Sequence, residues 1–182
     1  MTLSIKNLSK TYSNGVEALK NITLDIPVGM FGLLGPNGAG KSTLMRTLAT
    51  LQEPDTGNVF FDDIDILNDS NALKKQLGYL PQEFSFYPKE KAFDLLEHFA
   101  ILKGISNKSE RKVIVENLLK KVNLWEKRNH KIGSFSGGMK RRFGIAQILL
   151  GDPQLIIVDE PTAGLDPEER LRFYNLLNFR RK

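Results

Sequence analysis

The sequence predicts an α/β fold with a mostly parallel sheet, an N-terminal antiparallel β subdomain and a helical insertion. Residues 2–6 and 19–26 alternate apolar and polar side chains, which is typical of strands in a sheet with one face in water. Residues 30–34 and 155–158 are continuously apolar, which is typical of strands buried on both faces of a parallel sheet. The first apolar run leads through a glycine-rich loop into a helical pattern, and this order of strand, loop and helix builds a parallel α/β unit.

The composition is that of one globular domain, predicted to span residues 1–182. The 182 residues suffice for a hydrophobic core, and the shares of 41% hydrophobic and 26% charged residues are ordinary. The chain has no cysteine, which excludes disulfides, thiolate catalysis and cysteine-ligated zinc. A net charge of +5 fits a solvated basic surface, an attraction to anionic lipid or an attraction to nucleic acid, and the short basic run 140–142 does not choose among them.

The sequence shows neither a signal peptide nor a membrane span. Residues 1–7 alternate in polarity and lack an apolar core. No stretch approaches the ~18 uninterrupted apolar residues of a transmembrane helix. We therefore expect a soluble protein with no direct membrane insertion, whose membrane role would come through a partner.

The elements between the two apolar runs follow from periodicity and capping signals. Residues 43–51 have helical spacing, and residues 58–66 alternate like a strand. Residues 92–103 and 109–124 are predicted to be helices, and Ser109 is the predicted N-cap of the second.

Two further helices are predicted over residues 137–150 and 167–177. The helical stretch in the middle of the chain is interpreted as a helical subdomain over residues 85–132. The rest of the single domain, residues 1–84 and 133–182, then forms the core together with the β subdomain.

The strongest motif is the run G-P-N-G-A-G-K-S at residues 35–42, which fits the phosphate-loop pattern G-x-x-x-x-G-K-[ST]. Glycines let backbone N–H groups converge on phosphate oxygens, and the following helix points its positive end at the same oxygens. Lys41 is predicted to reach the β- and γ-phosphates of a nucleoside triphosphate, and the Ser42 hydroxyl to coordinate Mg²⁺. The alternative is a glycine-rich turn with an incidental lysine, but the apolar run before the loop and the amphipathic helix after it favour the phosphate loop.

Two acidic residues follow the apolar run 155–158. In an open α/β sheet the carboxyl end of a strand faces the binding crevice. Asp159 is predicted to bind Mg²⁺ through water, which leaves Glu160 to orient and polarise an attacking water as general base. Taken alone, the two acids are better explained as a solvated strand end, and only the phosphate loop upstream favours the catalytic interpretation.

The run S-F-S-G-G-M-K-R-R at residues 134–142 resembles the signature motif, L-S-G-G-Q, of the ABC ATPases. A helix N-terminus at Ser136, Gly137 and Gly138 offers a hydroxyl and bare N–H groups to an anion. In that family the anion is the γ-phosphate of ATP held by a second cassette. The resemblance, which covers residues 2–180, therefore implies a head-to-tail dimer of cassettes around two nucleotides.

The same resemblance implies the fold of a P-loop NTPase (RecA-like) core and roles for further residues. Gln82 matches the Q-loop, which contacts the γ-phosphate and Mg²⁺ and links them to the helical subdomain. Asp166 matches the D-loop at the dimer interface. Tyr12 matches the aromatic residue that stacks on adenine, although plain packing between two strands explains it equally well. The resemblance implies three sets of site residues. The implied metal ligands are Ser42, Gln82 and Asp159, and the implied catalytic residues are Glu160, Lys41 and Gln82. The implied nucleotide-binding residues are Tyr12, Gly35, Pro36, Asn37, Gly38, Ala39, Gly40, Lys41, Ser42, Thr43, Ser136, Gly137, Gly138 and Asp166.

Two departures from the family pattern affect these expectations. Met139 stands where glutamine is commonest, and with the K-R-R that follows it resembles the ABC-2 type export branch. The family places a switch histidine well beyond the catalytic glutamate, whereas this chain ends 22 residues after Glu160 (182 − 160), and its two histidines, His98 and His130, lie upstream. We therefore expect a C-terminally truncated cassette that is less stable, prone to associate and able to bind nucleotide, but poor at hydrolysing it.

The function implied by the resemblance is that of an ATP-binding and ATP-hydrolysing subunit that uses ATP and Mg²⁺. It would power transport, in the export direction, through a separate membrane-spanning permease subunit, from the cytoplasmic face of the cell membrane. The first alternative is a soluble ABC ATPase acting on the ribosome or DNA. Such proteins carry a second cassette, a coiled coil or a zinc hook, none of which this sequence shows, so nucleic acid is not expected as a partner. The second alternative is a nucleotide-binding remnant with little turnover.

Overall fold

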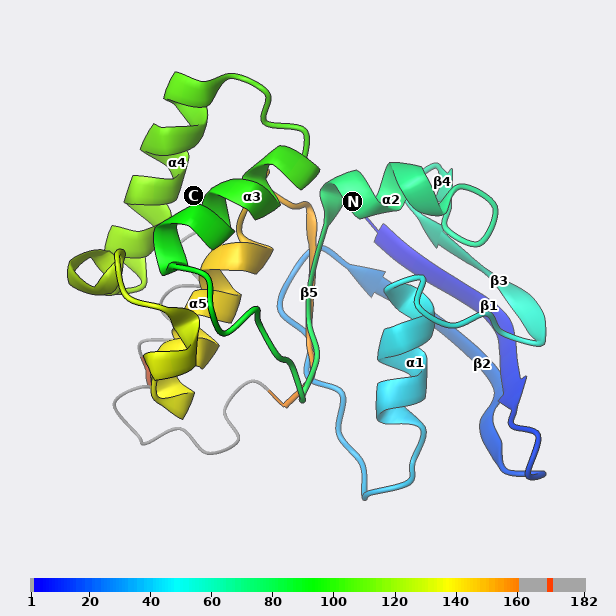
Figure 1. Cartoon of the computed structure of the whole chain (residues 1–182). Coiled ribbons are helices and arrows are strands. Elements are labelled where there is room, and N and C mark those ends of the chain that lie inside the picture. The colour runs from blue at the N-terminus through cyan, green and yellow to red at the C-terminus, as the bar shows by residue number, and fades with distance from the viewer. Residues whose placement is uncertain (1, 161–169, 172–182) are drawn as a thin grey trace. The chain divides into compact units, whose positions relative to one another are not determined.

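The computed structural model describes residues 2–160, 170 and 171. The chain divides into two compact units, residues 1–77 and residues 78–182 (Figure 1). The predicted combination of an antiparallel N-terminal sheet with parallel strands is confirmed.

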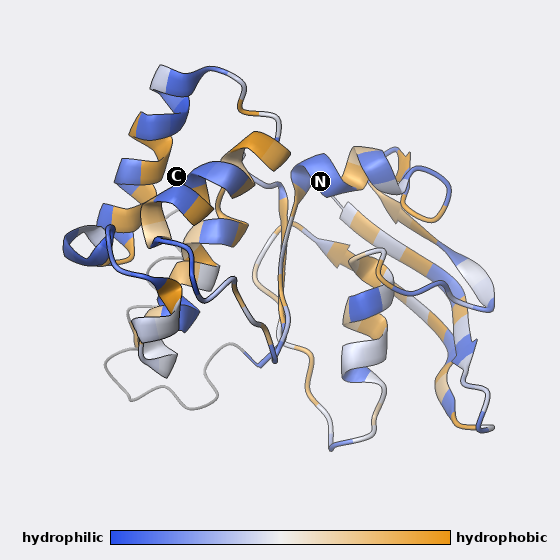
Figure 2. Cartoon of the chain, in the orientation of Figure 1, coloured by the Kyte–Doolittle hydropathy of each residue, from blue (hydrophilic) through white to orange (hydrophobic). Residues whose placement is uncertain are grey.

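The first unit is built on a four-stranded antiparallel sheet with the strand order β2-β1-β3-β4. Leu3 of the central strand β1 lies opposite Ile26 of β2 on one side and Phe61 of β3 on the other. The alternation predicted from the sequence is visible as bands of hydropathy along these strands (Figure 2), and Ile5, Leu8 and other apolar residues are buried on one face. The strands are β1 (Thr2–Thr11), β2 (Glu17–Pro27), β3 (Thr56–Phe61) and β4 (Ile64–Asp65).

The single strand predicted over residues 58–66 is wrong in one respect, because the structure divides it into β3 and β4. The chain reverses between them at Asp62, whose φ of 50° lies in the left-handed region. Aspartate tolerates this conformation better than most residues do, so an alternating pattern can contain a tight turn without glycine. Phe61 then pairs with Ile64 directly across the turn.

Two helices accompany this sheet. The helix predicted over residues 43–51 is present as α1 (Lys41–Leu48), and it begins immediately after the glycine-rich loop. The second helix, α2 (Ser70–Gln76), was not expected from the sequence, and Asp69 caps it by accepting a hydrogen bond from the Ala72 N–H at 3.0 Å.

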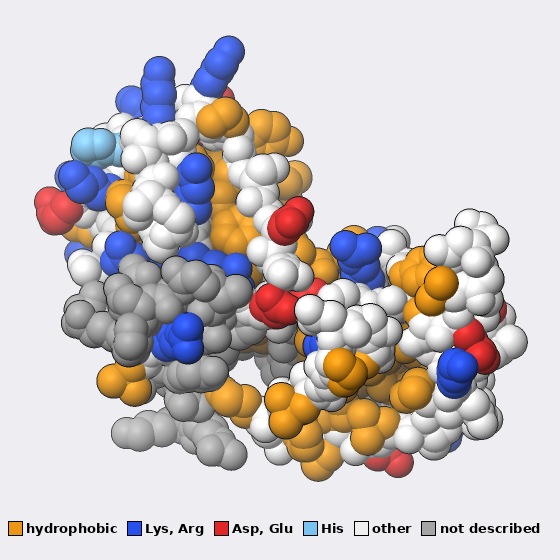
Figure 3. Space-filling model, turned by 90° about the horizontal axis from the view of Figure 1, so that it is seen from below, with side chains coloured by type: hydrophobic (Ala, Val, Ile, Leu, Met, Phe, Trp, Pro, Cys, Tyr) orange, Lys and Arg blue, Asp and Glu red, His pale blue; other side chains and the backbone are white. Residues whose placement is uncertain are grey.

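The strand predicted over residues 30–34 is wrong. These residues belong to no strand and form no ladder with any strand in the part of the chain that the structure describes. Their side chains are exposed as well, and Leu34 is 93% exposed. The space-filling view shows hydrophobic side chains gathered at the surface of this unit (Figure 3). An apolar run predicts burial, but a strand also needs partners for its backbone N–H and C=O groups, and sequence alone does not supply them.

In its described residues, the second unit contains a parallel pair of strands and three principal helices. The strand predicted over residues 155–158 is confirmed as β6 (Leu155–Val158), which pairs with β5 (Leu77–Leu80). Helices α3, α4 and α5 gather beside this pair (Figure 1) and enclose a core of leucine, isoleucine, valine and phenylalanine side chains. The helices are α3 (Ala92–Leu102), α4 (Lys108–Lys121) and α5 (Gly137–Ile148), with short 3₁₀ turns η1 (Trp125–Lys127) and η2 (Ile132–Ser134) between α4 and α5.

The predicted helices over residues 92–103, 109–124 and 137–150 are confirmed as α3, α4 and α5. The helical subdomain proposed for residues 85–132 stays a prediction. Of the helix predicted over residues 167–177, only residues 170 and 171 belong to the described part of the chain, where they are helical. None of the helices in the described residues is long and apolar enough to cross a membrane.

A buried arginine closes the connection between α3 and α4. Arg111 is 8% exposed, and its Nη1 donates to the carbonyl oxygens of Ile105 and Ser106, each at 3.0 Å. Its Nε lies 3.3 Å from Oε1 of Glu97 on α3. This side chain therefore satisfies the backbone of the α3–α4 loop and pairs with the neighbouring helix.

The N-cap of α4 is Asn107, and the prediction of Ser109 is wrong. The Asn107 side-chain oxygen accepts from the N–H groups of Ser109 and Glu110, at 2.9 and 3.1 Å. Ser109 therefore lies inside the first turn. Asparagine is at least as good an N-cap as serine, and the sequence offers both within three residues.

Replacing Asn107 with alanine should lower the free energy of unfolding by about 1 kcal/mol, because two N–H groups at the start of α4 lose their acceptor. The measurement is urea unfolding followed by circular dichroism. Ser109→Ala is the matched control and should change stability much less. A larger loss for Ser109→Ala than for Asn107→Ala would restore Ser109 as the cap.

Candidate functional site

In the first unit, the glycine-rich loop leads directly into α1. Gly40 is the N-cap of this helix, with a φ of 81°, and no side chain caps its first N–H groups. The first turn also carries no acidic residue. Uncapped N–H groups at a helix N-terminus present partial positive charge, and this arrangement favours an anion.

Lys41 lies across the same loop. Its ammonium donates to the carbonyl oxygens of Gly35 and Pro36, at 2.8 and 2.7 Å. The ammonium is therefore held over the loop at the beginning of α1. The positive charge of Lys41 and the partial positive charge of the helix N-terminus are thus both at this loop. This set of donors, which contains no competing carboxylate, fits the polyphosphate of a nucleotide.

Tyr12 lies beside α1. Its hydroxyl is 3.0 Å from Oγ1 of Thr43, and it donates to Oε1 of Gln52 at 3.1 Å. The hydrogen bond with Thr43 is the main cause that lowers the pKa of Tyr12, while partial burial acts in the opposite direction. The tyrosine is thus tied to the helix that follows the phosphate loop, and its stacking on adenine stays a prediction.

In the second unit, the two predicted carboxylates lie at the end of β6. Asp159 is buried, and its N–H donates to the carbonyl of Leu80 at 2.9 Å, which ties the end of β6 to the end of β5. Glu160 follows with an exposed side chain. Its Oε2 accepts from Nε2 of Gln82 at 2.9 Å. The structure therefore brings the predicted Q-loop residue and the predicted general base into direct contact.

The S-G-G run begins α5 as expected. Ser136 is the N-cap, and its hydroxyl accepts from the Met139 N–H at 3.2 Å. The position where a side chain would start at Gly137 is open, with no atom within 4 Å. The space beside Gly137, on the side where a Cβ would lie, is therefore open.

The sequence interpretation missed Arg141, which it treated only as part of a basic run. Arg141 is 7% exposed and lies on α5, where it donates to backbone carbonyls on both sides of the Gln82–Glu160 contact. Burial lowers the pKa of Arg141, and Glu160 and Asp159 act in the opposite direction. The sequence does contain a signal for the burial of Arg141. Ile145 and Ile148 follow it at helical spacing, so they share its helix face, and both are buried.

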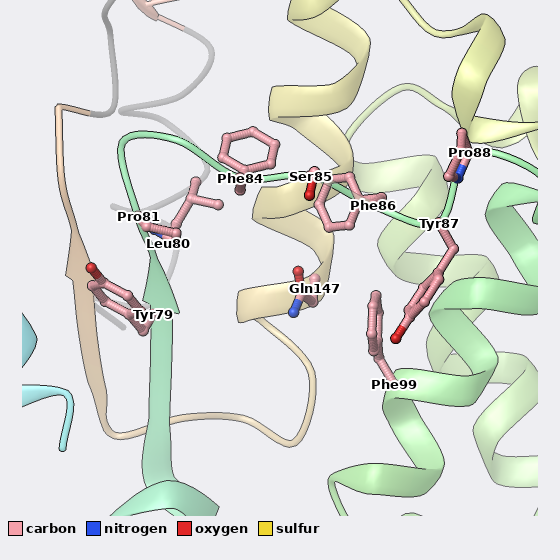
Figure 4. Close-up of a pocket in the computed structure, with 10 residues that line it drawn as sticks. All are labelled: Tyr79, Leu80, Pro81, Phe84, Ser85, Phe86, Tyr87, Pro88, Phe99 and Gln147. Atoms are coloured by element: carbon pink, nitrogen blue, oxygen red, sulfur yellow. The ribbon is translucent and has the colours of Figure 1, made fainter. Parts of the chain in front are cut away.

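A hollow of about 510 Å³ lies in the same unit, and Pro81, the residue before Gln82, is one of the residues that line it (Figure 4). Aromatic rings form much of its wall, and the ring of Phe86 contacts those of Phe84, Phe99 and Phe143 with centroid distances of 5.3, 6.4 and 4.9 Å. The lining comes mainly from the end of β5 and the segment after it, with one residue each from α3 and α5. It consists of Tyr79, Leu80, Pro81, Phe84, Ser85, Phe86, Tyr87, Pro88, Phe99 and Gln147.

Comparison with known families identifies this combination of motifs. The sequence model of the family described as ABC transporter matches residues 19–163, which include the phosphate loop, Gln82, the S-G-G run and both carboxylates. The chain belongs to the ABC transporter family.

Related ABC transporter proteins cover most of this chain. The linearmycin resistance ATP-binding protein LnrL of Bacillus subtilis is 38% identical over 169 residues, which are 92% of this chain and 54% of LnrL. The ABC transporter A family member 8 of Dictyostelium discoideum is 39% identical over 180 residues, or 95% of this chain and 21% of that protein. The methionine import ATP-binding protein MetN 1 of Bacillus thuringiensis is 37% identical over 183 residues, or 96% of this chain and 54% of MetN 1. The chain thus spans little more than half of these relatives at most.

Solved ABC cassettes share the fold, which confirms the predicted P-loop NTPase class. The dimeric cassette MJ0796, solved in a post-hydrolysis state with ADP and Pi, superimposes with a TM-score of 0.86 at 34% identity. The superposition covers 97% of this chain and 81% of that cassette.

The predicted ABC site residues divide between the two units. Tyr12 and residues 35–43 belong to the first unit, whereas Gln82, residues 136–138, Asp159 and Glu160 belong to the second. Within the second unit Gln82 contacts Glu160. Asp166, in the predicted D-loop, lies outside the described residues. The individual roles of all these residues stay predictions.

Two glycines of the phosphate loop make a matched test of its backbone. Gly38 and Gly40 both have a φ of 81°, but a Cβ on Gly40 would lie 2.2 Å from the Ala18 carbonyl oxygen, while a Cβ on Gly38 would meet nothing within 4 Å. Gly38→Ala should therefore cost only the strain of the left-handed backbone, about 1 kcal/mol. Gly40→Ala should cost about 2 kcal/mol more, because the Ala18 backbone must move. Urea unfolding measures both, and equal losses would contradict this description of the loop.

Proposed function

We propose that this chain binds ATP with Mg²⁺ and hydrolyses it, as the ATP-binding subunit of an ABC transporter. The observation that carries the proposal is the phosphate loop: an ammonium held over the loop by the carbonyls of Gly35 and Pro36, at an uncapped helix N-terminus. Nearly the whole chain is also similar to a cassette that was solved with ADP and Pi.

Nucleotide binding rests on residues 35–43. The N–H groups at the start of α1 and the Lys41 ammonium would hold the phosphates, and Tyr12 would stack on the adenine. When bound, Mg²⁺ neutralises charge on the β- and γ-phosphates, and the residues that would hold it are Ser42, Gln82 and Asp159. Hydroxyl, amide and carboxylate oxygens are the ligands that this ion prefers.

Hydrolysis rests on Glu160. Its carboxylate orients a water molecule for attack on the γ-phosphate and accepts a proton from it. The amide of Gln82 donates to one carboxylate oxygen at 2.9 Å, which leaves the other oxygen available to the water. A hydrogen bond that restricts the carboxylate lowers the cost of holding it in the reactive geometry.

A second cassette would complete the site. The start of α5, with Ser136, Gly137 and Gly138, and the D-loop residue Asp166 would face the nucleotide held by that partner. The open backbone at Gly137 supports this contact, and a cassette of similar fold was solved as a dimer.

Hydrolysis would power transport through a separate membrane-spanning permease subunit, with the cassette on the cytoplasmic face of the membrane. The run M-K-R-R after the S-G-G motif favours export, as does the similarity to the resistance protein LnrL. The similarity to a methionine import protein is nearly as high, so identity alone does not distinguish the two directions. Gln82 and the helices α3 and α4 would carry the coupling to the permease.

Variants of Lys41 and Glu160 separate binding from turnover. Lys41→Ala should weaken MgATP binding about a hundredfold, because charge-assisted hydrogen bonds to phosphate are lost. Glu160→Gln should keep the affinity and lower turnover about a hundredfold or more, because the general base is removed. Calorimetry with MgATP and phosphate release measure the two effects.

Lys75→Ala is the control for Lys41→Ala, since Lys75 is an exposed lysine of the same unit. Unchanged affinity in Lys41→Ala would contradict the nucleotide site. Unchanged turnover in Glu160→Gln would contradict the assignment of Glu160 as general base, without affecting the proposal that the chain binds MgATP.

The membrane partner is tested by co-purification from the native cell. We expect a tagged chain to sediment with membranes and to retain a polytopic permease after mild detergent extraction. Co-sedimentation with ribosomes, and release by nuclease, would instead favour the soluble alternative.

A further inference from the structure

Arg141 is a buried charged side chain on α5, the helix that carries several side chains of the apolar core of the second unit. It lies on α5 between the S-G-G run and the buried residues Phe143 and Ile145. Its guanidinium is also 5.6 Å from the ring centroid of Phe84. A guanidinium in such surroundings must use its donors, because unpaired buried N–H groups of a cation are very costly.

Among the described residues, Arg141 donates to two chain segments that are remote in sequence. Nη1 donates to the carbonyl of Gln82 at 3.4 Å. Nη2 donates to the carbonyl of Asp159 at 3.3 Å and to the carbonyl of Glu160. One side chain therefore holds the backbone of both residues whose side chains meet in the Gln82–Glu160 hydrogen bond.

The backbone at Glu160 needs such support. Its φ of 46° lies in the left-handed region, which residues with a Cβ avoid. A non-glycine residue keeps this conformation only where its surroundings hold it. Here the carbonyl of Glu160 is an acceptor of Arg141, so the same contact that satisfies the arginine also fixes the turn after β6.

We propose that Arg141 is the positioning residue of the hydrolytic reaction. By clamping the carbonyls of residues 82, 159 and 160, it fixes the direction in which the Glu160 carboxylate points. This inference rests on the proposed function of Glu160 as general base, and it assigns to Arg141 no contact with substrate. The role requires the planar fork of a guanidinium, because one ammonium does not reach two separated segments with the same geometry.

Arg111 supplies a matched control. It is buried to a similar degree, at 8% exposed against 7% for Arg141, and it also bonds to backbone carbonyls, in its case two carbonyls of one loop. That loop joins α3 to α4 and carries none of the predicted site residues. Removing either arginine should destabilise the fold, whereas only Arg141 should affect the reaction.

The experiment compares Arg141→Met, Arg141→Lys and Arg111→Met in MgATP hydrolysis under single-turnover conditions, with calorimetry for binding. Arg141→Met should lower the rate constant at least about tenfold, because a small displacement of a general base is expensive, and should leave the MgATP affinity within about twofold of the wild type. Arg141→Lys should fall between Arg141→Met and the wild type. Arg111→Met should keep the wild-type rate per folded molecule, although its unfolding midpoint falls.

Hydrogen exchange gives a second readout that does not depend on turnover. The Asp159 N–H is bonded to the Leu80 carbonyl. Exchange at residues 158–160 should therefore accelerate in Arg141→Met and remain at the wild-type rate in Arg111→Met. If Arg141→Met does not fold, both measurements are made on Arg141→Lys. Its rate constant should be lower than that of the wild type, and its exchange at residues 158–160 should be faster.

Equal rate constants in the wild type and in folded Arg141 variants would overturn this role while leaving the proposed function intact. A loss of MgATP affinity with an unchanged rate would overturn it too. A wild-type chain that binds MgATP without splitting it would remove both the hydrolytic function and this role. Absence of MgATP binding by the wild type would show that the proposed function itself had failed.

Discussion

A buried guanidinium needs hydrogen-bond acceptors, and in the second unit this need links three segments of the chain. Arg141 on α5 is buried, so water is largely excluded from it and the protein must supply the hydrogen bonds that the side chain would make in solution. The carbonyls of Gln82, Asp159 and Glu160 meet this need. The position of α5 is therefore linked to the segment after β5 and to the end of β6. A helix that begins with the S-G-G run is in this way connected to the carboxylates of the proposed reaction.

Helix α1 of the first unit differs from α2, α4 and α5 in what it has at its N-terminus. Helices α2, α4 and α5 are each capped by a side-chain oxygen, from Asp69, Asn107 and Ser136. Helix α1 begins at Gly40 without such a cap and with Lys41 in its first turn, where a cation is unfavourable next to the helix dipole. This arrangement is tolerated if an anion binds there. The loop is thus less suited to stabilising α1 than to binding phosphate, which agrees with the proposed function.

Local signals predicted much of both units, and their failures have physical causes. The apolar strand 155–158 and the cap at Ser136 depend on neighbouring residues alone, and both are present. The apolar run 30–34 met the same criterion and yet forms no ladder with a described strand, because pairing requires a partner that periodicity does not reveal. Helix α2 was missed because its seven residues are mostly polar and hold one buried side chain, Leu73.

The phosphate-loop motif, the two carboxylates after a buried strand and the start of α5 could be read from the amino-acid order, because each is a pattern within a few consecutive residues. Only the tertiary structure decided that Gln82 contacts Glu160, 78 positions away, and that Arg141 clamps the backbone of both. Spacing along a chain fixes which residues share a helix face or a strand end. It does not fix which distant carbonyl a buried donor reaches, because that is set by the packing of α5 against the segments that follow β5 and β6.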